Sequence, residues 1–142
     1  MERVVIYTDG ACCGNPGKGG YAAIIQGHHE AQVTGSEPDT TNNRMELMAA
    51  IAGLEALPMS GLSVTVYSDS KYVVNGIMSW IVRWKRVGWR KRGGGHVLNR
   101  DLWERLDAAR SLHQVTFEWV RGHNGHVFNE RCDALANAAS QR

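Results

Sequence analysis

The first forty residues alternate between short apolar stretches and polar turns, a pattern typical of β-strands. Residues 3–8 form a run rich in β-branched side chains, and residues 21–26 and 30–35 form two further strand-like stretches. Glycine and proline dominate residues 14–20, which indicates a turn. Because the connections are short, we expect the three strands to pair as an antiparallel meander.

Helical spacing replaces this alternation after residue 40. Leu47, Ile51 and Leu54 recur on one face, which predicts a helix from Thr41 or Asn42 to about residue 57, capped by a threonine or asparagine side chain. A fourth strand is predicted over 62–68, parallel to the first because a helix separates the two. The remaining pattern predicts helices over 71–77, 80–86 and 99–111, a strand over 114–120 and a closing helix over 126–139.

This order of elements predicts an α/β fold. We expect a mixed five-stranded sheet flanked by helices, in which strands 1–3 form the meander and strands 4 and 5 run parallel to strand 1. The chain of 142 residues, 43% apolar and 21% charged, has the size and composition of one globular domain, so residues 1–142 are interpreted as a single unit.

Several features of the sequence bear on the cellular location of the protein. Its apolar runs are far shorter than the roughly 18 residues of a membrane span, and its first residues lack the apolar segment of a signal peptide. The three cysteines have neither disulfide-framework nor zinc-site spacing. We therefore expect a cytoplasmic protein without a membrane partner, and a monomer by default.

The net charge of +2 hides an uneven distribution. Residues 70–100 contain no acidic side chain but carry 8 of the 16 basic residues, interleaved with Trp80, Trp84 and Trp89. A basic segment with interspersed aromatic rings suits a polyanion that carries flat bases. Core packing is the alternative for any tryptophan. We expect it for Trp103 and Trp119 and leave it open for Trp80 and Trp84.

Two strands share one local design, in which an aspartate follows a tyrosine by two positions. If these strands are parallel neighbours, Asp9 and Asp69 emerge side by side on one face at their carboxyl ends. Ligands usually bind at this edge of an α/β sheet. A single aspartate after a strand commonly just opens a turn, but the matched pair favours a functional site.

A third carboxylate lies on the first predicted helix. Glu46 shares a stripe with Ala50, Gly53 and Leu57, which should face protein rather than water. A buried carboxylate needs a partner, which is either an arginine such as Arg44 or a cation shared with the two aspartates.

Asp133 on the closing helix is a candidate fourth carboxylate, with an ordinary solvated position as the alternative. Converging carboxylates repel each other, so the cluster makes most sense as a cage for hard divalent ions, Mg²⁺ or Mn²⁺. Two such ions about 4 Å apart can promote in-line displacement at phosphorus.

The sequence resembles bacterial ribonuclease HI, a family that cuts the RNA strand of RNA/DNA hybrids. The matching blocks occur in family order and cover nearly the whole chain; they are residues 7–10, 14–17, 40–47, 68–73, 80–92, 121–123 and 129–133. The block Thr-Thr-Asn-Asn-Arg-Met-Glu-Leu at 40–47 is highly specific.

The resemblance implies that four carboxylates bind two Mg²⁺ ions, with Mn²⁺ as a possible substitute, and cleave to a 3′-hydroxyl and a 5′-phosphate. They are Asp9, Glu46, Asp69 and Asp133. It also implies that His123 is the catalytic histidine. A histidine flanked by glycine can move to deliver or remove a proton.

The resemblance further implies how the hybrid is held. RNA 2′-hydroxyls are recognised in the family at positions matching Cys12, Asn15, Asn42 and Asn43, although Asn15 could instead shape its turn and Asn42 cap its helix. The DNA strand is held at positions matching Trp80 and Trp84, and one of its phosphates at positions matching Thr41 and Asn99. A basic protrusion at about 80–98 carries Lys85, Arg86, Arg90, Lys91 and Arg92. Many family members have a basic residue where this chain has Asp39.

Two other function classes are compatible with the same pattern. One is a hybrid-binding module without catalysis, against which the four carboxylates argue. The other is a nuclease or transposase of the same fold with another substrate, because a fold alone does not fix substrate.

Overall fold

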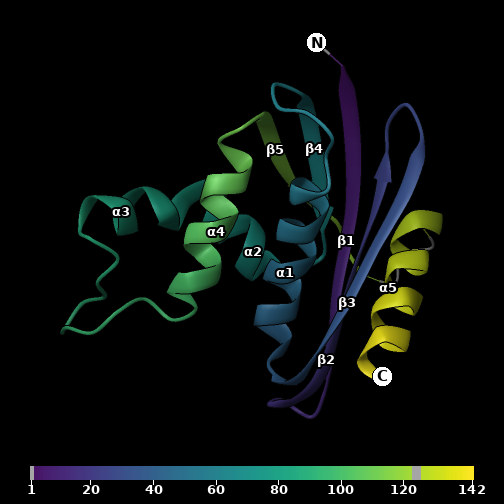
Figure 1. Ribbon diagram of the computed structural model, residues 1–142. Coiled ribbons are helices and arrows are strands. Elements are labelled where there is room, and N and C mark those ends of the chain that lie inside the picture. The colour runs from purple at the N-terminus through teal and green to yellow at the C-terminus, as the bar shows by residue number, and fades with distance from the viewer. Residues whose placement is uncertain (1, 123–125) are drawn as a thin grey trace.

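Five strands form one mixed sheet in the computed structural model, which describes residues 2–122 and 126–142 (Figure 1). The strands are β1 (Arg3–Cys13), β2 (Gly17–Gln26), β3 (Glu30–Thr40), β4 (Ser63–Ser68) and β5 (Gln114–Trp119). Their order across the sheet is β3-β2-β1-β4-β5. The first three pair antiparallel, whereas β4 runs parallel to β1 and β5 parallel to β4. The predicted fold class is therefore confirmed.

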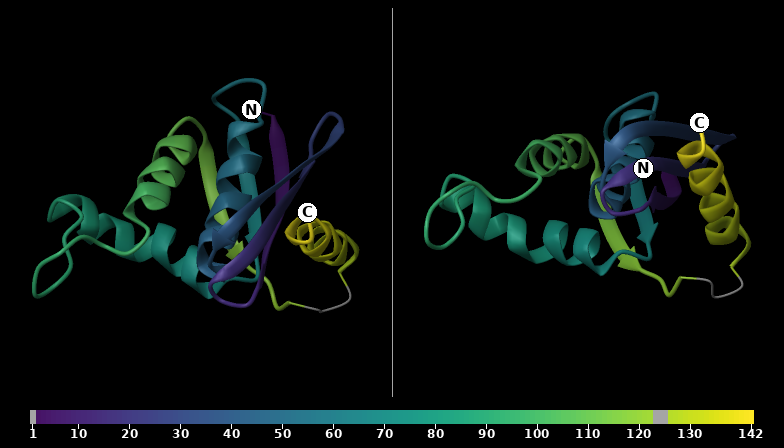
Figure 2. Two further views of the ribbon diagram at one scale, coloured as in Figure 1. Left: turned by 60° about the horizontal axis from the view of Figure 1, so that its bottom comes forward. Right: turned by 90° about the horizontal axis from the view of Figure 1, so that it is seen from below.

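Helices cover both faces of the sheet. They are α1 (Asn42–Glu55), α2 (Lys71–Asn75), the π-helical turn η1 (Gly76–Trp80), α3 (Ile81–Arg86), α4 (Arg100–Arg110) and α5 (Val127–Ser140). Helices α1 and α4 pack together on one face, and α5 lies against β1 and β2 on the other (Figure 1). Seen from below, α3 and the loop after it project away from the sheet (Figure 2). None of the helices described is long and apolar enough to cross a membrane.

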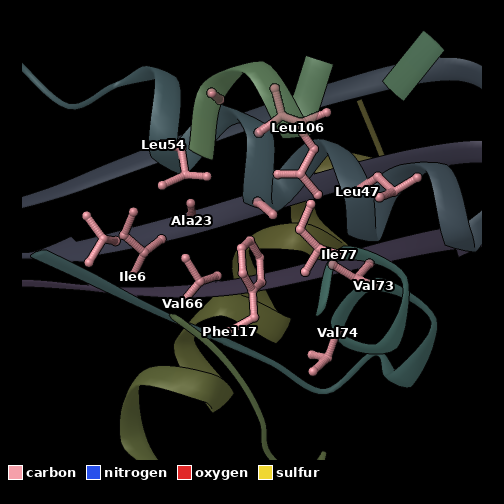
Figure 3. Packing of buried hydrophobic residues seen from close by; sticks show 14 of the residues in the cluster. Ile6, Ala23, Leu47, Leu54, Val66, Val73, Val74, Ile77, Leu106 and Phe117 are labelled. Carbon is pink, nitrogen blue, oxygen red and sulfur yellow. The ribbon is translucent and has the colours of Figure 1, made fainter. Parts of the chain in front are cut away.

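The core lies between the sheet and the α1–α4 layer. Side chains from strands and helices meet there without solvent exposure, as Figure 3 shows for Ile6, Leu47, Val66 and Leu106. Trp103 of α4 is also fully buried, which confirms its assignment to the core. Burial of this apolar surface, at roughly 25 cal/mol per Å², is the main force that holds α1 and α4 on the sheet.

All three strands of the meander are longer than predicted, and the turn between the first two is shorter. Residues 17–20 belong to β2 rather than to a turn. Their glycines serve packing: a Cβ at Gly19 would collide with Thr40 and Met45, and one at Gly20 with the backbone of α5. A glycine cluster that permits close approach of helices was thus misinterpreted as a wide turn.

The helical segment after β4 is continuous rather than divided near residue 78. The helices α2 and α3 are joined through η1 without an intervening loop. Residues 77–80 contain neither proline nor glycine, so nothing local ends the helix there. At the start of α1, the side chain of Thr41 accepts a hydrogen bond from the Arg44 N–H at 3.2 Å. Thr41 is therefore the cap, and the alternative of a capping Asn42 is wrong.

Candidate metal centre and nucleic-acid interface

Three carboxylates converge where β1 and β4 part. The parallel pairing of these strands ends at Tyr7 and Tyr67, and Asp9 and Asp69 follow two residues later in each chain segment. Glu46 approaches from the second turn of α1. One carboxylate oxygen from each of the three residues lies within 4.8 Å of the other two. The predicted convergence of Asp9, Glu46 and Asp69 is what the structure shows.

A close crossing of β1 and α1 brings Glu46 to this point. A Cβ on Gly10 would lie 2.5 Å from the Glu46 backbone nitrogen, so only glycine allows the strand to pass under the first turns of the helix. The helix then buries Glu46, which is 5% exposed. Arg44, the alternative partner, instead forms an ion pair with Asp101 at 2.8 Å and leaves Glu46 to the cluster.

The end of β5 holds the backbone around Asp69. Val120 donates its N–H to the Ser68 carbonyl at 2.9 Å, and the indole Nε1 of Trp119 donates to the Asp69 carbonyl at 3.1 Å. A Cβ on Gly122 would approach within 2.8 Å of Asp69 Oδ2. Trp119 is 41% exposed, with the Lys71 ammonium 4.7 Å from its ring centroid, so its assignment to the core is wrong. As the last residue of an edge strand, it lies outside the packed layer.

The cluster is electrostatically costly without a cation. Burial, the charge of Asp69 and contact with the Asp133 side chain raise the pKa of Asp9 to about 8. Burial, together with the charges of Asp9 and Asp69, also raises the pKa of Glu46 well above its ordinary value. Both shifts arise because negative charges are brought together out of water.

The fourth carboxylate lines a small pocket beside the cluster. Asp133, on α5, borders this pocket together with Thr8, Asp9, Asp69, Gly122, Asn129 and Glu130. It is partly exposed and does not belong to the tight group of three. Cys132 donates its thiol to the Tyr7 carbonyl at 3.1 Å and so fixes this turn of α5 against β1. This contact holds Asp133 where it lines the pocket beside Asp9 and Asp69.

The donor set fits a hard divalent cation. Among the described residues, two buried carboxylate oxygens of the cluster have no hydrogen-bond partner, Glu46 Oε1 and Asp69 Oδ1. Buried polar atoms are rarely left without a partner, and carboxylate oxygens are the ligands that Mg²⁺ and Mn²⁺ prefer.

Comparisons with known proteins agree with this geometry. The family model for RNase H matches residues 1–141. The chain belongs to the RNase H family. It is 57% identical over 137 residues to a protein named Ribonuclease H from Rhodopseudomonas palustris, covering 96% of this chain and 88% of the relative. It is 55% identical over 136 residues to a protein named Ribonuclease HI from Caulobacter vibrioides, covering 95% and 91%.

Solved structures show the same likeness. The crystal structure of a type 1 RNase H with the type 2 active-site motif superposes with a TM-score of 0.90 at 33% identity, over 99% of this chain and 73% of that one. The resemblance drawn from the motifs is thereby confirmed, and with it the expectation of a hydrolase of the nuclease type. Within this RNase H-family chain, His123 lies outside the described residues.

The residues expected to recognise RNA gather at the junction of β1, β2 and α1. Asn15 Oδ1 accepts the backbone N–H of Asn42 at 3.0 Å, which joins the β1–β2 turn to the helix start. Asn15 therefore does shape local structure. Cys12 directs its thiol to the Gly14 carbonyl at 2.8 Å, and Asn43 follows on the same helical turn as Asn42. The structure thus joins the turn that carries Asn15 to the helix start that carries Asn42 and Asn43.

Thr41 and Asn99, expected to hold a DNA phosphate, come from different elements but meet at one arginine. Arg44 donates its backbone N–H to Thr41 Oγ1 and its guanidinium to Asn99 Oδ1, each at 3.2 Å. Asp39 lines the same groove as Arg44, Asp101 and Arg105. The groove also holds Glu37, and both of its arginines are already ion-paired, Arg44 with Asp101 and Arg105 with Glu55.

The predicted basic protrusion forms a separate groove of about 370 Å³. Its walls are Ser79, Trp80, Arg83, Trp84, Arg90, Lys91 and Arg92. Trp80 is 39% exposed, whereas Trp84 packs one side against the core at 5.3 Å from the Trp103 ring and lines the groove with the other. Trp80 therefore lines the groove, whereas both alternatives apply to Trp84. Lys85 departs from the expectation, because it forms an ion pair with Asp107 at 3.0 Å.

Three residues that carry contacts in these sites have no signal in the sequence pattern. Arg44, Tyr72 and Trp119 each bond to a residue about thirty or more positions away. Arg44 and Tyr72 lie inside the family blocks whereas Trp119 lies outside them, and the blocks do not indicate what either residue touches.

Proposed function

We propose that the chain hydrolyses the RNA strand of RNA/DNA hybrids and leaves 3′-hydroxyl and 5′-phosphate ends. The observation that carries the proposal is the carboxylate trio Asp9, Glu46 and Asp69, with two buried and unpaired carboxylate oxygens, in a chain of the RNase H family. Its four-carboxylate set is complete with Asp133 beside the trio, which favours an enzyme over a binding module.

Asp9, Glu46, Asp69 and Asp133 would hold two Mg²⁺ ions, with Mn²⁺ as a substitute. Bound ions of this kind activate a water and stabilise the attacking and leaving oxygens of an in-line displacement. Glu46 is the fixed member, because burial in α1 leaves its side chain little freedom. Asp133 is more open and faces the pocket that an incoming phosphate would enter. His123, after β5, would take or deliver a proton as product leaves.

The hybrid would lie across the surface between these sites. Cys12, Asn15, Asn42 and Asn43 would test the RNA strand for 2′-hydroxyls, each of which can both donate and accept. Thr41, Asn99, Trp80 and Trp84 would hold the DNA strand, with Lys85, Arg86, Arg90, Lys91 and Arg92 in the protrusion. Since Lys85 is paired with Asp107, the other four basic residues would supply most of the attraction.

In this proposal residues 1–142 act as a single domain and a monomer in the cytoplasm. The described side chains that the proposal invokes come from one sheet, its helices and the loops that join them, so a single copy supplies them. A second copy would not be needed to complete the site.

Gel-resolved cleavage of end-labelled oligonucleotides tests the proposal. Four substrates are compared, an RNA/DNA hybrid, duplex RNA, duplex DNA and single-stranded RNA, each with Mg²⁺ and with EDTA. The wild type is run beside Asp69→Asn, which keeps the side-chain shape and removes the charge. We expect metal-dependent cutting of the hybrid's RNA strand alone, and its loss in the variant.

Other results would point elsewhere. Binding of the hybrid without cutting of any substrate would indicate a binding module. Cutting of duplex DNA would place the chain among nucleases of another specificity. End analysis of the RNA product checks the polarity, because a 3′-phosphate would contradict the proposed reaction.

A further inference from the structure

A network of hydrogen bonds joins the starts of α1, α2 and α4. Arg44 Nη1 donates to Asn99 Oδ1 at 3.2 Å, and the same guanidinium grips Asp101 through two bonds of 3.0 and 2.8 Å. Asn99 in turn donates from Nδ2 to the Tyr72 hydroxyl at 3.1 Å. The network continues into the core, because the indole of Trp103 donates to the same hydroxyl at 3.1 Å.

The network decides which hydrogen-bonding groups remain for a ligand. A threonine hydroxyl and an asparagine amide can each donate or accept. Here Arg44 occupies the acceptor side of both, with its backbone N–H on Thr41 Oγ1 and its guanidinium on Asn99 Oδ1. Each side chain keeps a hydrogen to donate, which is the hydroxyl hydrogen of Thr41 and the amide hydrogen of Asn99 that Tyr72 does not accept. Because a phosphate oxygen only accepts, the pair is converted into a receptor for an anion.

The Tyr72 hydroxyl fixes the NH2 group of the Asn99 amide. Its oxygen accepts from Asn99 and from Trp103, whose ring is fully buried and lies 5.3 Å from the tyrosine ring. Arg44 cannot accept a hydrogen bond, so a flipped amide would lose its contact with the guanidinium. Asn99 also has a left-handed backbone, with φ of 62°, which this network holds in place.

We propose that Arg44 and Tyr72 are positioning residues that present Thr41 and Asn99 as donors to one phosphate of the substrate's DNA strand. This inference rests on the proposed function. It also bears on Asp39, which lines a groove with Arg44. Because Asp101 already pairs with the Arg44 guanidinium, the oriented donors rather than the arginine charge would hold the phosphate.

The chain offers a matched control a few turns along the same helices. Arg105 of α4 donates two hydrogen bonds, of 2.8 and 2.6 Å, to the Glu55 carboxylate of α1. In the same way, Arg44 of α1 donates two hydrogen bonds to the Asp101 carboxylate of α4. Both ion pairs bridge the same two helices at the surface. Arg105 has no hydrogen bond to Thr41 or Asn99 in the described residues, so Arg105→Lys changes an equivalent bridge without touching the receptor.

The experiment measures hybrid binding in an Asp9→Asn background, where cleavage does not intervene. Arg44→Lys keeps the charge but cannot span the same bonds, and Tyr72→Phe removes only a hydroxyl. Each is compared with Arg105→Lys on hybrids whose DNA strand carries a single uncharged methylphosphonate, moved one position at a time. Thermal melting confirms that each variant is folded.

On the ordinary hybrid, we expect Arg44→Lys to weaken binding about tenfold, the effect of losing a charge-assisted network, and Tyr72→Phe about fivefold. Arg105→Lys should stay within about twofold, as surface ion pairs do. One methylphosphonate position should weaken the parent protein by a similar factor. At that position alone, Arg44→Lys and Tyr72→Phe should cause no further loss.

Losses that persist at every methylphosphonate position, or that match those of Arg105→Lys, would overturn the positioning roles while leaving the proposed function intact. If Arg44→Lys does not fold, Tyr72→Phe decides, and a loss below twofold refutes the inference. A parent protein that does not prefer the hybrid over duplex DNA would instead refute the proposed function itself.

Discussion

Replacing Asp9 with asparagine should stabilise the metal-free protein, by an amount that grows with pH. In the folded protein burial and neighbouring carboxylates raise the pKa of Asp9 to about 8, against an ordinary value of 3.8. Between these values the folded chain keeps a proton that the unfolded chain has released, so folding must take up a proton. Rising pH therefore destabilises the wild type across this window, and the effect is flat below and above it.

The magnitude follows from the width of the window. Each pH unit inside it lowers the free energy of unfolding by about 1.4 kcal/mol. Between pH 5 and 7 the wild type should lose about 3 kcal/mol through Asp9. Asp9→Asn has no proton to take up, so the difference in stability between variant and wild type should widen by this amount.

Urea unfolding followed by circular dichroism in EDTA, at pH values from 5 to 9, measures this difference. Because every other titrating group is shared, the comparison between the two proteins isolates the cluster. Saturating Mg²⁺ should stabilise the wild type at pH 8 and largely close the gap, since a ligand that binds only the folded state adds to its stability. Parallel stability curves for the two proteins across pH 5 to 7 would refute the argument.

Three further predictions concern other parts of the site. Trp119→Phe, which removes the hydrogen bond to the Asp69 carbonyl, should lower kcat severalfold with KM little changed and cost about 1 kcal/mol of stability by urea unfolding; an unchanged kcat would contradict the role. Gly10→Ala should destabilise by about 2 kcal/mol or more in the same assay, because the new methyl group meets the backbone of α1; wild-type stability would show that the crossing can relax. A triple substitution that neutralises Arg90, Lys91 and Arg92 should weaken hybrid binding and flatten its dependence on salt, while single-turnover cleavage stays near normal. Affinities equal to those of the wild type at several salt concentrations would refute the role of the protrusion.

The order of elements was predictable because it depends on local patterns. Strands reveal themselves by β-branched runs, and α1 by the spacing of its apolar face. The matched positions of Asp9 and Asp69 also follow from local sequence, since two parallel strands of the same design put equivalent residues at the same height. Glu46 could be added because its stripe of small and apolar neighbours required burial. These arguments use only periodicity and the cost of burying charge.

Close packing between distant elements was not predictable from the same patterns. The glycines at 19 and 20 indicate a turn by composition, and only the approach of α1 and α5 shows that they belong to a strand. Tryptophan is a residue type that commonly packs in a core, and only the place of Trp119 at the end of an edge strand leaves it 41% exposed beside Asp69. The residue type limits the contacts that a side chain can make, whereas its neighbours in the folded protein decide which of these contacts form.

The sequence by itself therefore determined the sheet, the carboxylates and the family to which they belong. The tertiary structure decided which partner each polar group has. Arg44 could have neutralised Glu46 two positions away, but the helix directs the two side chains apart, and Arg44 meets Asp101 and Asn99 instead. Hydrogen bonds between residues tens of positions apart depend on how helices and strands are stacked. That information exists only once the chain has folded.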